Sequence, residues 1–277
     1  MDTHKKLSAI CHRIYSDFFM PSRLDEYRLI LERALEHGYQ VYSIARFWED
    51  IKANNVEPEA KRLILRHDID TDVSCARAMW VIERSLNIFG SYYFRLSTLD
   101  YPLMLEIAKE GGEASYHFEE VATVAKQKGL RTKEQVYREM PSIQELFRYN
   151  LGQLRKKTGL PMQIVASHGD FVNRRLAAPN WLLLEDYDFR REMGVELEVY
   201  DEAFMRYVTS RHADTHYPKF WQPCSPMEAI SRGEPVIYLL IHPRHWRVNA
   251  RANAADDAKR VWEAFSYRLH TVKNKEM

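Results

Sequence analysis

The sequence predicts an α/β fold in which parallel strands close into a barrel, or nearly so. Three observations favour it: short apolar runs alternate with helical patterns, the length of 277 residues suits a single α/β barrel, and 45% hydrophobic residues supply a large core. The expected strands are residues 62–66, 91–95, 113–117, 163–167 and 236–241, with weaker candidates at 195–200 and 205–209.

Helical periodicity fills the segments before and between these runs. Two amphipathic helices at 5–19 and 24–36 and a third at 42–52 open the chain, followed by a charged loop at 53–61. Later helices are expected at 72–86, 102–110, 133–157 and 254–273. No internal repeat or linker interrupts this pattern. We therefore expect one domain over residues 1–277, with residues 1–60 as a helical extension packed on the barrel.

Charge and cysteine content narrow the class of protein. Lys and Arg total 40 against 39 acidic residues, so no net field favours nucleic acid or an anionic membrane. Cys11, Cys75 and Cys224 are odd in number and without paired spacing, which is typical of a reducing compartment. The first 20 residues lack the apolar run of a signal peptide, and the run at 236–241 is too short to cross a bilayer. The sequence thus predicts a cytoplasmic globular protein with no nucleic-acid partner and no transmembrane segment.

Polar residues follow four of the expected strands. These strands lead into His67-Asp68-Ile69-Asp70, His117-Phe118-Glu119, His168-Gly169-Asp170 and His242-Pro243. Four of the 11 histidines in the chain therefore lie at the ends of expected strands. Parallel α/β sheets bind ligands beyond the carboxyl ends of their strands. The sequence therefore predicts a site built from these residues.

Asp68 and Asp70 stand two residues apart, so an extended backbone points both carboxylates to the same side. Two such carboxylates repel each other unless a metal ion or a shared proton compensates. Helix capping is the alternative, since Asp70, Thr71 or Asp72 can each serve as an N-cap. One cap suffices, which leaves Asp68 unexplained and favours a catalytic or metal-binding role.

His117 and His168 each have a structural alternative: a hydrogen-bonded core histidine for the first, and a polar turn before Gly169 for the second. Together with Asp70 they form an imidazole and carboxylate set that suits zinc or a similar divalent ion. At the end of the last strand we expect His242 to donate a proton, with His245 peripheral and Trp246 offering an apolar surface for sugar stacking.

These motifs resemble the polysaccharide deacetylases (the chitooligosaccharide deacetylase homology group) from about Arg62 to Trp246. The resemblance implies a distorted (β/α)7 TIM-like barrel that hydrolyses acetyl groups with a divalent metal, here with extra N-terminal helices. It assigns Asp68 as general base and Asp70 as metal ligand. Glu113-Ala114-Ser115-Tyr116-His117 is similar to the motif that carries a metal histidine, and Leu240-Ile241-His242 to the motif that carries the general acid.

The chain departs from the family's pattern at two places. Val121 stands where a second metal histidine is usual, and Ser167-His168-Gly169 stands where an Arg-Pro pair is usual. We expect His168 to replace the lost ligand, with Glu119 or Glu120 as alternatives. Asp214 resembles the aspartate that orients acid and base in the family.

The resemblance implies a metal-dependent hydrolase that removes an acyl group, in particular acetyl, from an amino sugar or polysaccharide precursor, with zinc as the favoured cofactor. Two alternatives stay open: a sugar-binding or scaffold barrel without activity, and a metallohydrolase of non-sugar amides. A carbohydrate is the expected substrate, and the N-terminal helices are expected to pack on the barrel or on a second subunit of a homo-oligomer.

Overall fold

The computed structural model describes residues 3–57 and 59–273, and side-chain environments for residues 7–57 and 59–269. The chain divides into two compact units. Unit 1 contains the residues up to Ala114 together with Asp201–Asn253, and unit 2 contains Ser115–Tyr200 together with the segment from Ala254. Both units combine helices with mainly parallel strands, which confirms the α/β class. The single barrel domain over the whole chain stays a prediction.

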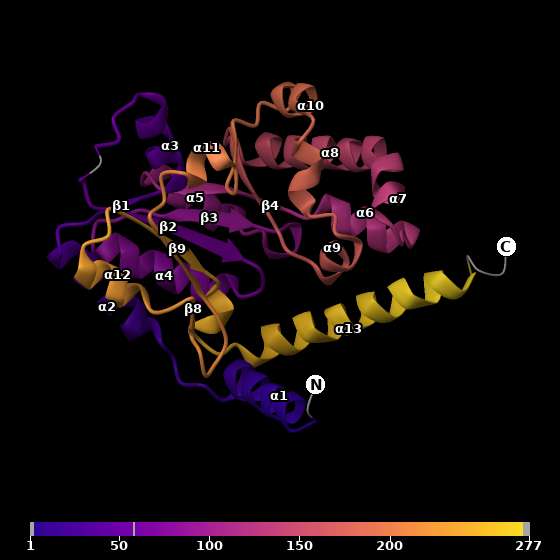
Figure 1. The fold of residues 1–277 in the computed structure, drawn as a ribbon, viewed down its shortest axis with the longest axis horizontal. Coiled ribbons are helices and arrows are strands. Elements are labelled where there is room, and N and C mark those ends of the chain that lie inside the picture. The colour runs from indigo at the N-terminus through magenta and orange to yellow at the C-terminus, as the bar shows by residue number, and fades with distance from the viewer. Residues whose placement is uncertain (1–2, 58, 274–277) are drawn as a thin grey trace. The chain divides into compact units, whose positions relative to one another are not determined.

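Unit 1 holds the N-terminal helices and the long strand β2 (Figure 1). Its strands are β1 (Gln40–Tyr42), β2 (Arg62–Ile69), β3 (Ser91–Phe94), β7 (Ser210–Asp214), β8 (Trp221–Gln222) and β9 (Val236–Ile241). Its helices are α1 (Thr3–Phe18), α2 (Leu24–Glu36), α3 (Ile44–Lys52), α4 (Val73–Ser85), η1 (Leu96–Thr98), α5 (Tyr101–Lys109), α11 (Glu202–Met205), α12 (Pro226–Arg232) and η3 (Pro243–His245).

The strand β2 lies at the centre of the unit 1 sheet. It pairs in parallel with β1, β3 and β9, and β9 pairs in parallel with β7, to which β8 adds an antiparallel edge. His67 is in register with Ile241, so Asp68 and His242 are the next residues along two neighbouring strands. Parallel pairing therefore brings the carboxyl ends of β2, β9 and β7 to one edge of the sheet.

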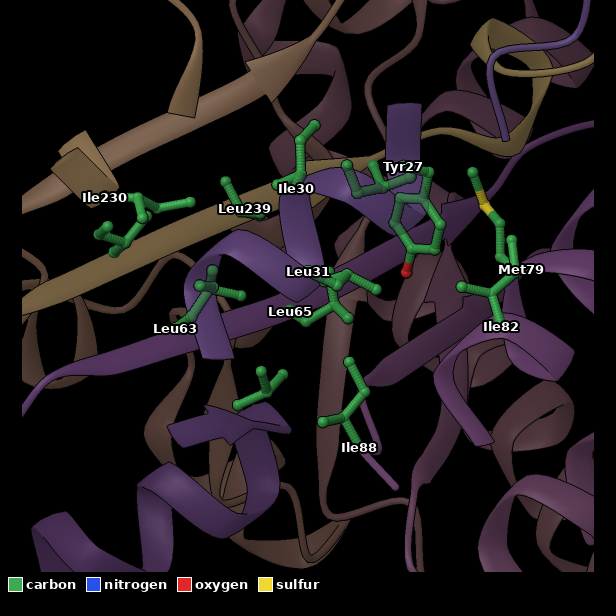
Figure 2. Packing of buried hydrophobic residues seen from close by; sticks show 14 of the residues in the cluster. Tyr27, Ile30, Leu31, Leu63, Leu65, Met79, Ile82, Ile88, Ile230 and Leu239 are labelled. Atoms are coloured by element: carbon green, nitrogen blue, oxygen red, sulfur yellow. The ribbon is translucent and has the colours of Figure 1, made fainter. Parts of the chain in front are cut away.

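The core of unit 1 explains why the N-terminal segment folds onto the sheet. Tyr27, Ile30 and Leu31 are spaced three and four residues apart on α2 and are at most 2% exposed. Figure 2 shows them beside side chains from β2, α4, α12 and β9: Leu63, Leu65, Met79, Ile82, Ile230 and Leu239. Burying one such aliphatic side chain contributes about 1.5–3 kcal/mol. Within unit 1, α2 packs on the sheet, and the packing of residues 1–60 as an extension on a barrel stays a prediction.

The first helix differs from the second. In α1, Leu7, Ile10 and Ile14 are each about half exposed or more. Packing of α1 against a second subunit stays a prediction. No helix in the described part of the chain combines the length and apolar character that a membrane crossing requires.

Unit 2 is built on three parallel strands, β4 (Glu113–Phe118), β5 (Ile164–Ser167) and β6 (Leu197–Glu198). Its helices, some of which Figure 1 draws in rose and orange, are α6 (Glu120–Lys128), α7 (Lys133–Arg138), α8 (Met140–Thr158), α9 (Phe171–Leu176), η2 (Asn180–Leu184), α10 (Tyr187–Glu192) and most of α13 (Ala250–Lys273). Tyr116 and Phe118 alternate with His117 along β4, and both rings pack against Phe147 of α8. His117 is thereby directed to the other face of the strand.

The structure corrects several expected elements. The expected strand at 205–209 is wrong, because α11 ends at Met205 and the strand β7 starts at Ser210. The expected helix at 133–157 is two helices that meet at Glu139, and Pro141 lies in the first turn of the second, where its missing N–H costs no hydrogen bond. The strand β2 runs to Ile69, so Asp68 lies within the strand and not after it.

Candidate functional site

Asp68 lies on β2 in unit 1, 3% exposed, and its carboxylate is held by Arg66. Arg66 Nε donates to Oδ1 and Nη2 to Oδ2, each at 2.7 Å, and Arg66 Nη1 donates to the Tyr238 hydroxyl at 3.0 Å. Arg66 and Asp68 share one face of β2 because they are two residues apart. The sequence reasoning looked only to a metal ion or a proton for compensation of the charge, and missed this guanidinium.

Asp70 follows β2 and is partly exposed. Its N–H donates to the Asp68 carbonyl at 3.0 Å. The N-cap of α4 is Asp72, whose Oδ1 accepts from the N–H groups of Ser74 and Cys75 at 3.1 and 3.2 Å. The capping alternative therefore applies to Asp72, and it explains neither Asp68 nor Asp70.

His242 and Asp214 form a tight pair at the same edge of unit 1. His242 Nδ1 is 2.6 Å from Asp214 Oδ1, and the His242 backbone N–H donates to Oδ2 at 2.8 Å. Trp246 Nε1 donates to Oδ2 at 2.7 Å, so Asp214 is fixed from three sides. The structure thus brings together His242, the expected proton donor, and Asp214, the carboxylate to which the family resemblance assigns its orientation.

The electrostatics of this pair favour imidazolium and carboxylate. Burial alone would lower the pKa of His242, but the charge and hydrogen bond of Asp214, aided by Asp70 and Asp68, raise it to about 9. Burial alone would raise the pKa of Asp214, but the imidazoles of His245 and His242 hold it well below its ordinary value. His242 keeps 23% of its side chain exposed, so a proton held on this ring is accessible from solvent.

Two expectations around this pair are wrong. His245 is not peripheral, because its Nδ1 lies 3.2 Å from Asp214 Oδ1 and only 12% of its side chain is exposed. Trp246 offers no sugar-stacking surface, because it is fully buried against Tyr27 and Trp221. Sequence reasoning also missed His216, whose ring centroid lies 4.3 Å from that of His245. Burial, reinforced by His245, lowers the pKa of His216 to about 4.

His67, which precedes Asp68, is a core histidine. It is fully buried and stacks on Tyr92, with ring centroids 4.1 Å apart. Its Nε2 lies 2.9 Å from the Tyr27 hydroxyl and 3.1 Å from Glu83 Oε1, and its Nδ1 lies 3.1 Å from the Ser91 carbonyl. This network stabilises the interior beneath the candidate site of unit 1.

In unit 2 the structure brings His117 and His168 together. His168 Nδ1 lies 3.2 Å from His117 Nε2, and the two side chains come from the ends of paired strands. His117 Nδ1 lies 3.0 Å from the Ala166 carbonyl. A hydrogen bond from Nδ1–H to this carbonyl leaves Nε2 of the neutral ring with a lone pair. Both residues are buried, with exposed fractions of 2% and 8%.

The spacing of these nitrogens fits a metal site. Two nitrogens each about 2.0–2.1 Å from a tetrahedral zinc ion lie roughly 3.3 Å from one another. The 3.2 Å between His117 Nε2 and His168 Nδ1 matches that spacing, and a carbonyl partner on the far nitrogen is typical of histidine ligands. Asp70 belongs to unit 1 and the two histidines to unit 2, so the full set predicted from the sequence stays a prediction.

The side chain of the alternative ligand Glu120 is engaged in the core of unit 2. Its Oε1 accepts from the Tyr116 hydroxyl at 2.5 Å and from Asn150 Nδ2 at 2.9 Å. Burial raises the pKa of Glu120 to about 7. Glu119 directly precedes α6 and is partly exposed. Of the two glutamates, Glu120 has a structural explanation in the core of unit 2.

Glu113, the first residue of the motif that ends in His117, also has a structural role. Its carboxylate accepts from the Ser91 hydroxyl at 2.6 Å, from the Tyr93 hydroxyl at 2.8 Å and from the Ala45 N–H at 2.9 Å. It thereby ties β3 to the start of α3. Burial raises the pKa of Glu113 above its ordinary value.

Comparisons of this chain with protein-family models, with curated proteins and with solved structures gave no match in any of the three. The described residues form two groupings that can carry chemistry. Unit 1 has an imidazole and carboxylate pair with Asp68 on the neighbouring strand, and unit 2 has a pair of imidazoles.

Proposed function

We propose that the protein is a metal-dependent hydrolase that removes an acetyl group from an amino sugar or polysaccharide precursor, on the distorted (β/α)7 barrel that the motifs imply. The observation that carries this proposal is the edge of unit 1, where His242, held by Asp214, stands one strand away from Asp68. A group that stays protonated near pH 7 beside a carboxylate is the arrangement that acid–base hydrolysis needs.

His242 acts as the general acid. With a pKa of about 9 it carries its proton at neutral pH, and Asp214 fixes the ring through Nδ1, which leaves Nε2 to donate. An amine or alkoxide leaves poorly unless it is protonated as the bond breaks. The partly exposed ring is able to deliver that proton to the departing sugar nitrogen or oxygen.

Asp68 acts as the general base. Arg66 fixes the plane of its carboxylate with one hydrogen bond to each oxygen. Each carboxylate oxygen has a second lone pair. Asp68 accepts a proton from the attacking water through one of these while Arg66 keeps its orientation.

His117 and His168 are proposed to hold a divalent ion, zinc in preference, and the motif resemblance supplies Asp70 as a third ligand. The imidazole donors and their 3.2 Å separation support this assignment. A divalent ion held by these residues would supply a water molecule whose pKa is lowered from about 16 to about 7, and a positive charge for the developing oxyanion.

The test is acetate release from a panel of N-acetylated sugars and their nucleotide conjugates by the zinc-loaded protein. Asp68→Asn removes the base with little change of shape and should lower turnover by about 100-fold to 10,000-fold while zinc content is unchanged. The matched control is Glu113→Gln, which changes a buried structural carboxylate that is not assigned a catalytic role. Turnover retained in Asp68→Asn would remove Asp68 as the base.

One observation favours a sugar-binding protein without activity as the second candidate. Arg66 engages both oxygens of Asp68, an arrangement that also serves a purely structural ion pair. A fully zinc-loaded protein that binds N-acetylated sugars tightly and releases no acetate would establish this candidate. Acetate release from simple amides but not from sugars would instead identify a metallohydrolase of non-sugar amides.

A further inference from the structure

A pocket of about 490 Å³ opens within unit 2 beside His168. Its size falls in the range of roughly 300–1,000 Å³ that is typical of small-molecule sites. Its walls include Ser167, His168, Arg174, Trp181 and Tyr200. Arg174, Trp181 and Tyr200 have no assigned role as acid, base or positioning residue.

The wall of this pocket is held rigidly by two buried asparagines. Asn180 Nδ2 donates to the His168 carbonyl at 2.6 Å and to Asn173 Oδ1 at 3.0 Å, and Asn173 Nδ2 donates to the Ala178 carbonyl at 2.7 Å. Ala177 has a φ of 49°, a left-handed conformation that residues with a β-carbon seldom adopt. Ala177 is the C-cap of α9, a position at which helices often end in this conformation. The pocket is therefore preformed, and a ligand need not order it.

Of the charged side chains Asp170 and Arg174 that line the pocket, Arg174 is the one that can bind a ligand. Asp170 is engaged: its Oδ1 accepts from the Val172 N–H at 2.8 Å and its Oδ2 from Lys126 Nζ at 2.9 Å. Lys126 in turn pairs with Glu263 at 2.6 Å, so these three charges form one network. Arg174 is exposed on the pocket wall, and within the described residues no carboxylate forms an ion pair with its guanidinium.

An aromatic surface complements this cation. Trp181 is 39% exposed and Tyr200 is partly exposed, and both line the same pocket. Aromatic rings offer an apolar face with a polar handle, which suits the C–H face of a sugar ring. A guanidinium forms strong, often bidentate hydrogen bonds with carboxylate and phosphate groups.

We infer that this pocket binds a sugar that carries an anionic substituent, a carboxylate or a phosphate, with Trp181 against the ring and Arg174 on the anion. Placing a sugar next to His168 rests on the proposed function, and it narrows the substrate class from amino sugars in general to acidic or phosphorylated ones. Arg174 then determines specificity.

Isothermal titration of the full chain, with and without zinc, measures binding of three probes: an N-acetylhexosamine 1-phosphate, an N-acetylhexosaminuronic acid and the neutral methyl glycoside of an N-acetylhexosamine. We expect at least one anionic probe to bind about ten-fold more tightly than the neutral one. The better anionic probe identifies the source of the charge. Equal affinity for all three, or no binding at all, would overturn the inference.

Arg174→Gln should reduce the affinity for the anionic probe to the affinity for the neutral one. Arg175→Gln is the matched control, because Arg175 is the next residue of α9, is exposed and does not line the pocket. Trp181→Ala should weaken all three probes by a similar factor, with an unchanged melting temperature as the check on folding. A loss in Arg175→Gln as large as in Arg174→Gln would reject Arg174 as the specificity residue.

Binding and turnover fail independently in this design. If the zinc-loaded protein releases no acetate but prefers the anionic probe through Arg174, the proposed reaction is wrong and the inference about the pocket holds. If acetate is released equally from charged and neutral sugars and Arg174→Gln changes neither binding nor rate, the reaction holds and the inference is wrong.

Discussion

His242 in unit 1 and His117 in unit 2 both lie at the carboxyl end of a buried parallel strand, but their Nδ1 atoms have different partners. His242 Nδ1 lies 2.6 Å from a carboxylate oxygen of Asp214. His117 Nδ1 lies 3.0 Å from the backbone carbonyl of Ala166, and its Nε2 faces a second imidazole. A negative partner stabilises imidazolium. A carbonyl that accepts a hydrogen bond from Nδ1–H leaves Nε2 of a neutral imidazole with the lone pair.

The same residue type thus acquires two chemistries from its neighbours. A protonated imidazole donates a proton and cannot bind a metal, because metal binding needs the lone pair that the proton occupies. A neutral imidazole with one nitrogen engaged offers the other to a metal ion. We therefore expect substitution of His242 and of His117 to change different measured quantities.

The largest expected effect is on turnover. His242→Ala should lower the rate of acetate release from an N-acetylated sugar by about 100-fold to 10,000-fold, because the departing amine then receives no proton. Zinc content should be unchanged. Activated acetyl esters, whose leaving groups need no protonation, should lose far less rate. The measurement is the ratio of rates for these two substrates in wild type and variant.

A comparable loss for both substrates would contradict the assignment of His242 as a general acid. Loss of zinc from His242→Ala would erase the distinction between the two histidines. His216→Ala is the control in the same region, because its ring packs near His245 and has no assigned role in proton donation.

The second effect is on metal affinity. His117→Ala and His168→Ala should each weaken zinc binding by about 100-fold or more, since removal of a ligand costs at least as much as loss of an outer partner. Asp70→Ala should do the same if the ligand set from the sequence is right. The measurement is competition with a chelator, with zinc content checked by mass spectrometry.

The Glu119 and Glu120 double alanine variant distinguishes the third ligand. Because Glu120 bonds to Tyr116 and Asn150, we expect this variant to lower stability and to keep its zinc affinity. If zinc affinity falls in the glutamate variant and not in His168→Ala, a glutamate and not His168 is the third ligand.

Strand ends were the most predictable part of the site. Apolar runs followed at once by His or Asp marked β2, β4, β5 and β9, and the structure pairs His117 with His168 and His242 with Asp214. Strand position alone was sufficient for His117 and His168, because parallel register brings strand ends to a common edge. Asp214 came only from the family resemblance, and it ends β7, a strand that the sequence placed at 205–209.

Features that depend on tertiary packing were not predictable in the same way. Arg66 stands two residues before Asp68 in the sequence. Its guanidinium could be recognised as the partner of the Asp68 carboxylate only once the structure showed that β2 includes both residues. His245 reaches Asp214 because η3 bends the chain after Pro243. Trp246 is buried because α2 covers it, and no local pattern signals a contact so far apart in sequence.

The pH dependence of stability gives the smallest expected effect and tests the His242–Asp214 pair without any substrate. The pKa of His242 rises from 6.5 to about 9 on folding, so the folded state binds a proton more strongly than the unfolded chain does. The stabilisation is complete below about pH 6.5 and is lost as the pH rises through 9. Asp214, with its lowered pKa, contributes stability above pH 3.8 that is lost in acid.

Urea unfolding of the metal-free protein at pH 6.5 and at pH 9.5 measures this contribution. Wild type should lose roughly 2–3 kcal/mol more than His242→Asn between these values, an amount set by the rise in pKa and reduced by solvent screening of the partly exposed ring. Glu120, whose pKa is about 7, titrates in both proteins and cancels in the difference. Equal slopes in wild type and His242→Asn would show that Asp214 does not hold a proton on His242.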